Sequence, residues 1–337
     1  MADLVRWMER WQIAPYIAAI VLGGTVGWLA PAVAPTLAVG INPVLGLLLF
    51  ATFLGVPLIQ VGRALLHIRF LGTVLVVNFI LVPVIVFGLS RFVAGDRALL
   101  LGVLLVLLTP CVDYVIVFTG LAGGARERLL AATPLLMLLQ IVLLPVYLLL
   151  FAGPDTVSAI EITPFLEAFV LLIVIPLLAA ATVQWIARRH RLGRATEALM
   201  QSVMVPLMMA TLAVVIGSQV AAVGSRIVSL LQVVPLYVAF LVIMVIVGLV
   251  AGRLVRLDVP GIRALVFSGS TRNSLVVLPL ALALPASLSL AALAVVTQTL
   301  VELVGMVIFV RLVPRLTGHS RPGAVPRTGA PSSSGCD

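Results

Sequence analysis

The sequence has few charged residues and no lysine, and the scarcity of charge limits the classes of protein to which the chain can belong. Only 10% of its 337 residues are charged, whereas 62% are apolar and the mean hydropathy is +1.27. Soluble domains average about a quarter charged and about half apolar residues, so a soluble core cannot hide this much apolar surface. The composition therefore indicates an integral membrane protein.

Cysteine and histidine are also scarce. Cys111 lies in a hydrophobic run and Cys336 in a tail rich in Gly, Pro and Ser, so their positions argue against a disulfide, and no zinc-ligand spacing occurs. The paired aspartates, HExxH motif or acidic diphosphate-binding cluster of an intramembrane enzyme are absent as well. We therefore expect neither a cofactor nor an enzymatic activity.

Long apolar segments fill most of the chain. None alternates with the period of two of a membrane β-barrel, and most approach the roughly 20 residues that cross about 30 Å of hydrocarbon. The sequence predicts an all-α integral membrane protein with ten transmembrane helices. These spans lie near residues 13–30, 41–61, 70–92, 98–121, 129–151, 165–187, 199–222, 229–252, 262–284 and 288–312.

The net charge of +9 comes from arginine and could indicate nucleic acid or lipid headgroups as partners. The positions of the arginines indicate membrane topology instead. With the N-terminus in the cytoplasm, all but four of the 21 arginines face the cytoplasm or its boundary; Arg91, Arg97 and Arg226 lie outside, and Arg272 lies within the membrane. This distribution follows the positive-inside rule. We expect a protein of the cytoplasmic membrane with both termini in the cytoplasm and no nucleic-acid partner.

The two halves of the chain have matching hydropathy. A shift of roughly 155 to 160 residues lays the first, third, fourth and fifth spans on the sixth, eighth, ninth and tenth. Because five is odd, the second half enters the membrane with opposite polarity, which gives an inverted repeat. We predict repeats at 13–151 and 165–317, an extracytoplasmic linker at 152–164, a cytoplasmic N-terminus at 1–12 and a disordered tail at 318–337. Chance superposition of evenly spaced segments is the alternative.

Polar interruptions divide the fourth and ninth spans at corresponding places. They are Thr109-Pro110-Cys111-Val112-Asp113 and Ser268-Gly269-Ser270-Thr271-Arg272-Asn273-Ser274. Pro110 removes a backbone donor, and Gly269 and Ser270 loosen the second helix. In hydrocarbon such breaks persist only where the loose ends face protein, water or a ligand. If the broken helices cross, their ends form a site at mid-membrane. A simple proline kink is the alternative.

Three ionisable residues lie deep in predicted spans, namely Asp113, Arg272 and Glu302. Each costs about 2.5–3.5 kcal/mol at the bilayer centre on insertion scales. Asp113 and Arg272 can pair across the crossing, either as a structural contact or as a pair that a substrate opens. Glu302 has no basic partner nearby in its own helix and is the candidate proton carrier. Cys111 follows the break, where a thiol can meet a ligand, although buried cysteine is usually inert.

The sequence around these residues resembles a known family. The run Pro110-Cys111-Val112-Asp113-Tyr114-Val115-Ile116-Val117-Phe118, followed by Leu121-Ala122-Gly123-Gly124, is similar to the fourth span of arsenite permeases in the bile acid/sodium symporter superfamily. The similarity continues at Arg272-Asn273-Ser274 and from Gln298 to Glu302, where that branch carries a glutamate. In layout the resemblance covers all ten spans.

The resemblance implies a secondary transporter that exports arsenite, or a related trivalent metalloid, in exchange for protons. It makes Cys111 the transient arsenic ligand and Glu302 the carboxyl that exchanges the proton. The other residues that we expect at the substrate site are Asp113, Arg272, Asn273 and Ser274.

Two positions depart from the superfamily pattern. Bile acid transporters hold sodium with a glutamate and a glutamine at the ninth-span crossing, where this chain has Ser268 and Arg272, which argues against sodium coupling. Asp113 stands in place of a small or hydroxyl residue and leaves the substrate open. The alternative function is therefore a sodium- or proton-coupled transporter of a small organic anion, with Arg272 binding its carboxylate. A sensor with broken helices is a third possibility, and no sequence signal indicates an oligomeric state.

We predict that Asp113→Ala and Arg272→Ala each lower the yield of folded protein and that the double variant regains it. Removing one member of a buried pair leaves the other charge uncompensated and costs about 3–5 kcal/mol, whereas removing both can be nearly neutral. The measurement is the monodisperse fraction of extracted protein in size-exclusion chromatography. Additive losses in the double variant would show that the two residues do not meet.

Overall fold

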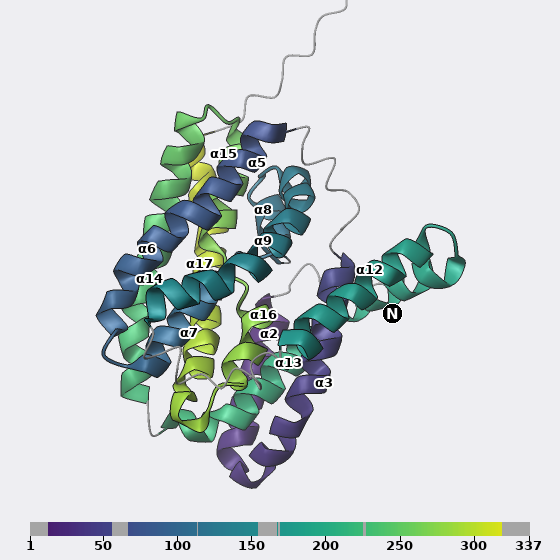
Figure 1. Ribbon diagram of the computed structural model, residues 1–337, viewed down its shortest axis with the longest axis vertical. Coiled ribbons are helices and arrows are strands. Elements are labelled where there is room, and N and C mark those ends of the chain that lie inside the picture. The colour runs from purple at the N-terminus through teal and green to yellow at the C-terminus, as the bar shows by residue number, and fades with distance from the viewer. Residues whose placement is uncertain are drawn as a thin grey trace, which may run out of the picture.

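The computed structural model describes residues 13–55, 67–112, 114–153, 167, 169–224 and 227–318, and these residues form helices and no β-strand (Figure 1). The predicted all-α membrane architecture is confirmed. The α-helices are α2 (Ile13–Leu29), α3 (Ala34–Gly55), α5 (Ile68–Val76), α6 (Val82–Ser90), α7 (Arg97–Leu107), α8 (Tyr114–Leu121), α9 (Arg126–Ala152), α12 (Ile175–Ala187), α13 (Arg191–Gly224), α14 (Ile227–Leu254), α15 (Val259–Ser270), α16 (Ser274–Leu282) and α17 (Leu290–Thr317).

Seven helical stretches of the described chain are long and apolar enough to cross a membrane. They are Pro31–Gly55, Ile68–Val93, Arg126–Ala152, Val170–Ala187, Arg191–Ser218, Leu230–Leu254 and Leu290–Thr317. The number is smaller than ten because α2 is short and because the predicted fourth and ninth spans are each divided, into α7 and α8 and into α15 and α16. No half of a divided span is long enough to cross the hydrocarbon by itself.

The boundaries of two helices differ from the predicted spans. Helix α3 begins at Ala34 instead of residue 41, and α13 begins at Arg191 instead of residue 199. Hydropathy identifies only the part of a helix that lies in lipid. The backbone hydrogen bonds of α13 begin earlier, in a segment with polar residues such as Arg194 and Glu197. Most of the predicted linker and nearly all of the tail lie outside the described residues.

The divided helices begin and end where local sequence requires it. Asp96 caps α7, because its carboxylate accepts hydrogen bonds from the backbone N–H groups of Ala98 (2.9 Å) and Leu99 (3.1 Å). Helix α7 ends at Leu107, since Pro110 lacks a donor and disfavours helical geometry at the residue before it. Helix α15 begins with Pro260 in its first turn, where a missing N–H costs nothing.

A π-helical turn, η4 (Val77–Leu81), joins α5 to α6 in the third predicted span. Pro83 crowds the carbonyl of Phe79 one turn earlier, and the wider turn relieves this contact. The freed Phe79 carbonyl accepts a hydrogen bond from the Tyr147 hydroxyl of α9 at 2.6 Å. The same turn carries Asn78, which is completely buried and points into the centre of the molecule.

The helices pack in two groups, which lie on different sides of Figure 1. Helices α2, α3, α12 and α13 pack on one another and form the first group. Helices α5 to α9 and α14 to α17 form the second, in which α7 and α14 both pack along α17. The groups touch where α16 meets α3 and where α13 meets α17. Both divided spans therefore lie in the second group, and α16 lies at this boundary.

Arg263 of α15 connects the start of that helix to the C-terminal ends of α8 and α17. This residue of α15 is only 8% exposed, and its guanidinium donates to the carbonyls of Ala122 (3.0 Å) and Gly318 (2.8 Å) and to the hydroxyl of Thr317 (2.9 Å). The first of these carbonyls follows α8, and the other two groups end α17. One buried side chain thus binds the C-terminal ends of two helices, whose last carbonyls have no partner within the helix.

Helices α7 and α17 approach closely at Gly102. A Cβ atom built there would lie 2.6 Å from the carbonyl oxygen of Ala291, so the two backbones touch. Such small-residue contacts are typical of helix packing in membranes. The close contact brings the N-terminal half of the fourth span against the helix that carries Glu302.

We predict that Gly102→Ala lowers the melting temperature of the detergent-solubilised protein, because the added methyl forces α7 and α17 apart at a cost of about 1–3 kcal/mol. Gly88→Ala is the matched control: no atom outside the local helix lies within 4 Å of the added carbon. Alanine favours the helix there, so the control is expected to melt at or slightly above the native temperature. Equal melting temperatures for the two variants would contradict the close contact.

Candidate functional site

The two divided helices cross at Pro110 and Arg272. The chain between α7 and α8 and the chain between α15 and α16 run antiparallel and form one β-bridge. The N–H of Cys111 donates to the carbonyl of Thr271 (3.2 Å), and the N–H of Asn273 donates to the carbonyl of Thr109 (2.8 Å). Pro110 occupies the bridge position that needs no donor. The loose backbone of each break is therefore satisfied by the other break.

Glu302 of α17 supports this crossing. It is completely buried, and its carboxylate accepts a hydrogen bond from the backbone N–H of Arg272 at 2.8 Å. The side-chain amide of Gln298 donates to the same carboxylate oxygen, and the Tyr114 hydroxyl donates to the other oxygen at 2.5 Å. Three donors converge on one carboxyl group, an arrangement that suits the ionised form.

The Arg272 side chain turns back over the end of α15. It is completely buried, and its guanidinium donates to the carbonyls of Ser268 (2.9 Å) and Gly269 (2.5 Å) and to the side-chain oxygen of Asn78 (2.9 Å). A weaker contact reaches the carbonyl of Leu107 at 3.4 Å. Asp113 lies outside the described residues, so its pairing with Arg272 stays a prediction.

Cys111 lies at the centre of the crossing. Its side chain is completely buried, and its backbone N–H makes one of the two hydrogen bonds of the bridge. The backbone of Cys111 and the Glu302 carboxylate bind the same peptide unit of the ninth span: the N–H of Cys111 donates to the carbonyl of Thr271, and the carboxylate accepts from the N–H of Arg272. Among the described residues no group of three or more His, Cys, Asp or Glu side chains comes together.

The remaining predicted site residues lie on either side of the second break. Asn273 caps α16, since its side-chain oxygen accepts from the N–H of Val276 at 3.4 Å. Ser274 opens that helix, and its hydroxyl accepts a hydrogen bond from Thr299 at 2.8 Å. Gly269 and Ser270 are the last two residues of α15. The extended break thus consists of residues 271–273, after both of them.

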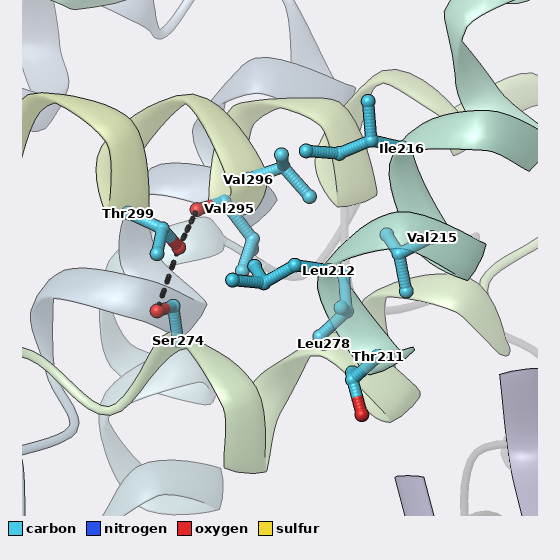
Figure 2. A pocket seen from close by; sticks show the side chains of 9 residues that line it. All are labelled: Thr211, Leu212, Val215, Ile216, Ser274, Leu278, Val295, Val296 and Thr299. Atoms are coloured by element: carbon cyan, nitrogen blue, oxygen red, sulfur yellow. Dashed lines mark hydrogen bonds between the residues drawn. The ribbon is translucent and has the colours of Figure 1, made fainter. Parts of the chain in front are cut away.

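A small cavity adjoins the Ser274 and Thr299 hydroxyls, at the boundary between the two helix groups (Figure 2). Its volume of about 10 Å³ accommodates about one water molecule at most. A larger solute can occupy this place only after the groups separate. The lining comes from α13, α16 and α17 and consists of Thr211, Leu212, Val215, Ile216, Ser274, Leu278, Val295, Val296 and Thr299.

Two residues with central contacts carry no special signal in the sequence. Tyr114 follows Asp113, but nothing in the local pattern shows that its hydroxyl reaches Glu302, 188 positions away. Asn78 is one of several polar residues in predicted spans, and its side chain bridges Ser268 and Arg272, which lie 190 and 194 positions away. The signal that could have identified it in the sequence is an asparagine in an apolar span shortly before Pro83, where a widened turn can form.

Comparison with known proteins identifies the family. Residues 42–230, just over half of the chain, match the family described as Sodium Bile acid symporter family, and the match runs from α3 to the start of α14. Among curated proteins, none matches the chain closely enough to count as a relative. Members of the matched family are transporters. The chain is therefore a multi-pass membrane protein that belongs to the sodium bile acid symporter family.

Proposed function

We propose that this protein is a secondary transporter that exports arsenite, or a related trivalent metalloid, in exchange for protons. The proposal depends on one observation: the backbone of Cys111, whose thiol is buried, and the buried carboxyl group of Glu302 bind the same short break. The N–H of Cys111 donates to the carbonyl of Thr271, and the N–H of the next residue, Arg272, donates to Glu302. Cys111 and Glu302 are therefore linked through one peptide unit.

The substrate chemistry follows from the thiol. Arsenite is neutral As(OH)₃ near pH 7, and trivalent arsenic binds thiolate sulfur. When Cys111 attacks, a sulfur–arsenic bond forms, one arsenic–oxygen bond breaks, and the thiol proton leaves with the hydroxide as water. A single thiol gives a reversible attachment, which suits a carrier because the solute must also leave.

The proton chemistry follows from Glu302. Tyr114, Gln298 and the Arg272 backbone all donate to this carboxylate. A carboxyl group that binds a proton becomes a donor, so the protonated Glu302 would donate to the Tyr114 hydroxyl, which can turn its own proton to the carbonyl of Arg272 at 3.1 Å. Protonation would therefore change the hydrogen bonds between α17 and the crossing. This links the proton to the geometry around Cys111.

Alternating access requires two conformations of nearly equal energy. We infer that the chain crosses the membrane of the cell ten times, with both termini in the cytoplasm. The seven long helices, α2 and the two divided spans support this count. Two inverted five-helix repeats, at 13–151 and 165–317, would relate the two conformations by symmetry. The boundary beside the Ser274 cavity is where the helix groups would part.

Transport of a small organic anion is the second candidate. One observation favours it: the Nε–H of Arg272 has no hydrogen-bond partner within the part of the chain that the structure describes. A carboxylate could accept from this donor, with Asp113 then released to a cation. Competition by organic acids and indifference to loss of Cys111 would distinguish this function from metalloid export.

We predict that Cys111→Ser abolishes arsenite accumulation in everted membrane vesicles, because a hydroxyl is a poor ligand for trivalent arsenic. Cys336→Ser is the matched control and is expected to transport at the native rate. Flux is measured with imposed proton or sodium gradients, and expression is checked by size-exclusion chromatography. Full arsenite flux in Cys111→Ser at native expression would remove the thiol from the mechanism.

We predict that Glu302→Gln retains exchange of substrate across the membrane but loses acceleration by a pH gradient. Glutamine preserves size and one acceptor oxygen, whereas it cannot exchange a proton in this pH range. Counterflow of arsenite at equal pH on both sides separates exchange from coupling. Sodium is expected to be dispensable, so a flux that requires sodium and ignores pH would refute the proton assignment.

We predict that Tyr114→Phe destabilises the protein by about 1.5–3 kcal/mol, because it removes a hydrogen bond to a charged group. Tyr237→Phe is the matched control: this buried hydroxyl donates to the neutral carbonyl of Ala294 at 2.9 Å, so the expected loss is about 0.5–1.5 kcal/mol. In a Glu302→Gln background the Tyr114→Phe effect is expected to shrink. An unchanged effect there would mean that Glu302 is not ionised in this conformation.

A further inference from the structure

The C-terminal ends of two half-helices meet at the crossing. Helix α7 ends at Leu107 and α15 ends at Ser270, both within the membrane part of the chain. The last carbonyls of a helix have no partner in the helix and carry the negative end of its dipole. In hydrocarbon these groups need a donor or a cation, because water cannot reach them freely. Discontinuous membrane helices commonly meet this need with a bound ion.

The Arg272 guanidinium occupies the position of such an ion. Each hydrogen bond that it donates within the described residues ends on a neutral oxygen: the carbonyls of Leu107, Ser268 and Gly269 and the amide oxygen of Asn78. The Phe240 ring closes another side, with the guanidinium carbon 5.4 Å from its centroid. Carbonyl and amide oxygens together with an aromatic face form a cage suited to a cation.

Asn78 is oriented so that its amide oxygen, and not its NH₂ group, faces the inside of the cage, which favours a positively charged occupant. Its amide NH₂ donates to the carbonyl of Val74 and to the hydroxyl of Ser268, both at 3.0 Å. These two bonds fix the amide so that its oxygen faces Arg272. Asn78 lies in the π-helical turn η4, whose wider geometry directs this side chain inward. Four elements, namely α7, α14, α15 and η4, thus contribute to one site.

We propose that this cage is a cation site and that Arg272 is its permanent, covalently attached occupant. An arginine stays protonated at physiological pH and cannot dissociate into solution. The crossing is therefore neutralised in both conformations of the protein without an ion from either side. Glu302 is left as the group that can exchange a cation, in the form of a proton. This inference rests on the crossing geometry and not on the identity of the substrate.

The proposal can be tested by removing the guanidinium group from the cage. Arg272→Ala leaves the carbonyls and Asn78 in place, so guanidinium ion, and secondarily sodium or potassium, is expected to fill the space. The melting temperature of the purified variant is expected to rise with the logarithm of the millimolar guanidinium concentration. Native protein, and Arg91→Ala, in which an exposed contact to the Phe151 carbonyl is lost, are expected to show no rise. Tetramethylammonium chloride controls for ionic strength.

A rise in Arg272→Ala alone supports the cage. No rise with guanidinium, sodium or potassium, or the same rise in Arg91→Ala, overturns it. If Arg272→Ala does not fold, Arg272→Lys and Arg272→Gln decide the question, since they have similar length and differ in charge. The lysine variant is expected to melt above the glutamine variant. A glutamine variant of equal or greater stability overturns the proposal, because a neutral donor would then serve as well as a cation.

Discussion

The structure depends on how two interrupted helices satisfy their backbone groups inside a membrane. A break that exposes N–H and carbonyl groups costs several kcal/mol per group in hydrocarbon. Here the two breaks cross, and each supplies the partner that the other lacks, through Cys111 with Thr271 and through Asn273 with Thr109. Neither break would be stable alone, and so the crossing fixes the relative position of all four half-helices.

Glu302 and Arg272 satisfy the backbone groups that the crossing leaves without partners. Glu302 accepts the N–H of Arg272, which has no backbone partner at the bridge, and the guanidinium of the same residue covers the carbonyls at the end of α15. Arg272 therefore binds the Glu302 carboxylate through its backbone N–H and binds the carbonyls at a helix end through its guanidinium. Tyr114 and Asn78 orient these two contacts. The result is a compact polar centre surrounded by apolar helices.

The position of this centre suits a carrier. It lies in the second helix group and close to the first, where the described cavity holds about one water molecule at most. A site that is closed in this conformation and adjoins a boundary between two packed groups can open when the groups move apart. Close backbone contacts such as Gly102 with Ala291 hold the second group together. Membership of a transporter family agrees with this organisation.

Much of the architecture follows from the sequence. Apolar content and segment length determine an all-α membrane protein. Pro110 among polar residues and the polar run at 268–274 indicate the two breaks, because freed backbone groups in hydrocarbon need other partners, whereas prolines in purely apolar surroundings, such as Pro145 and Pro235, stay inside helices. The sequence also singles out Cys111, Arg272 and Glu302, since a thiol at a break and charges in hydrocarbon are costly or unusual.

Only the tertiary structure decided which atoms these residues contact. The sequence allows Arg272 to face a carboxylate, whereas its guanidinium binds carbonyls and Asn78, and its backbone binds Glu302. Asn273 and Ser274, expected at the substrate, also cap and open α16. The Tyr114 hydroxyl binds Glu302, which lies 188 positions away in the sequence. Contacts of this range depend on the crossing angle and register of packed helices, which local residue preferences do not contain.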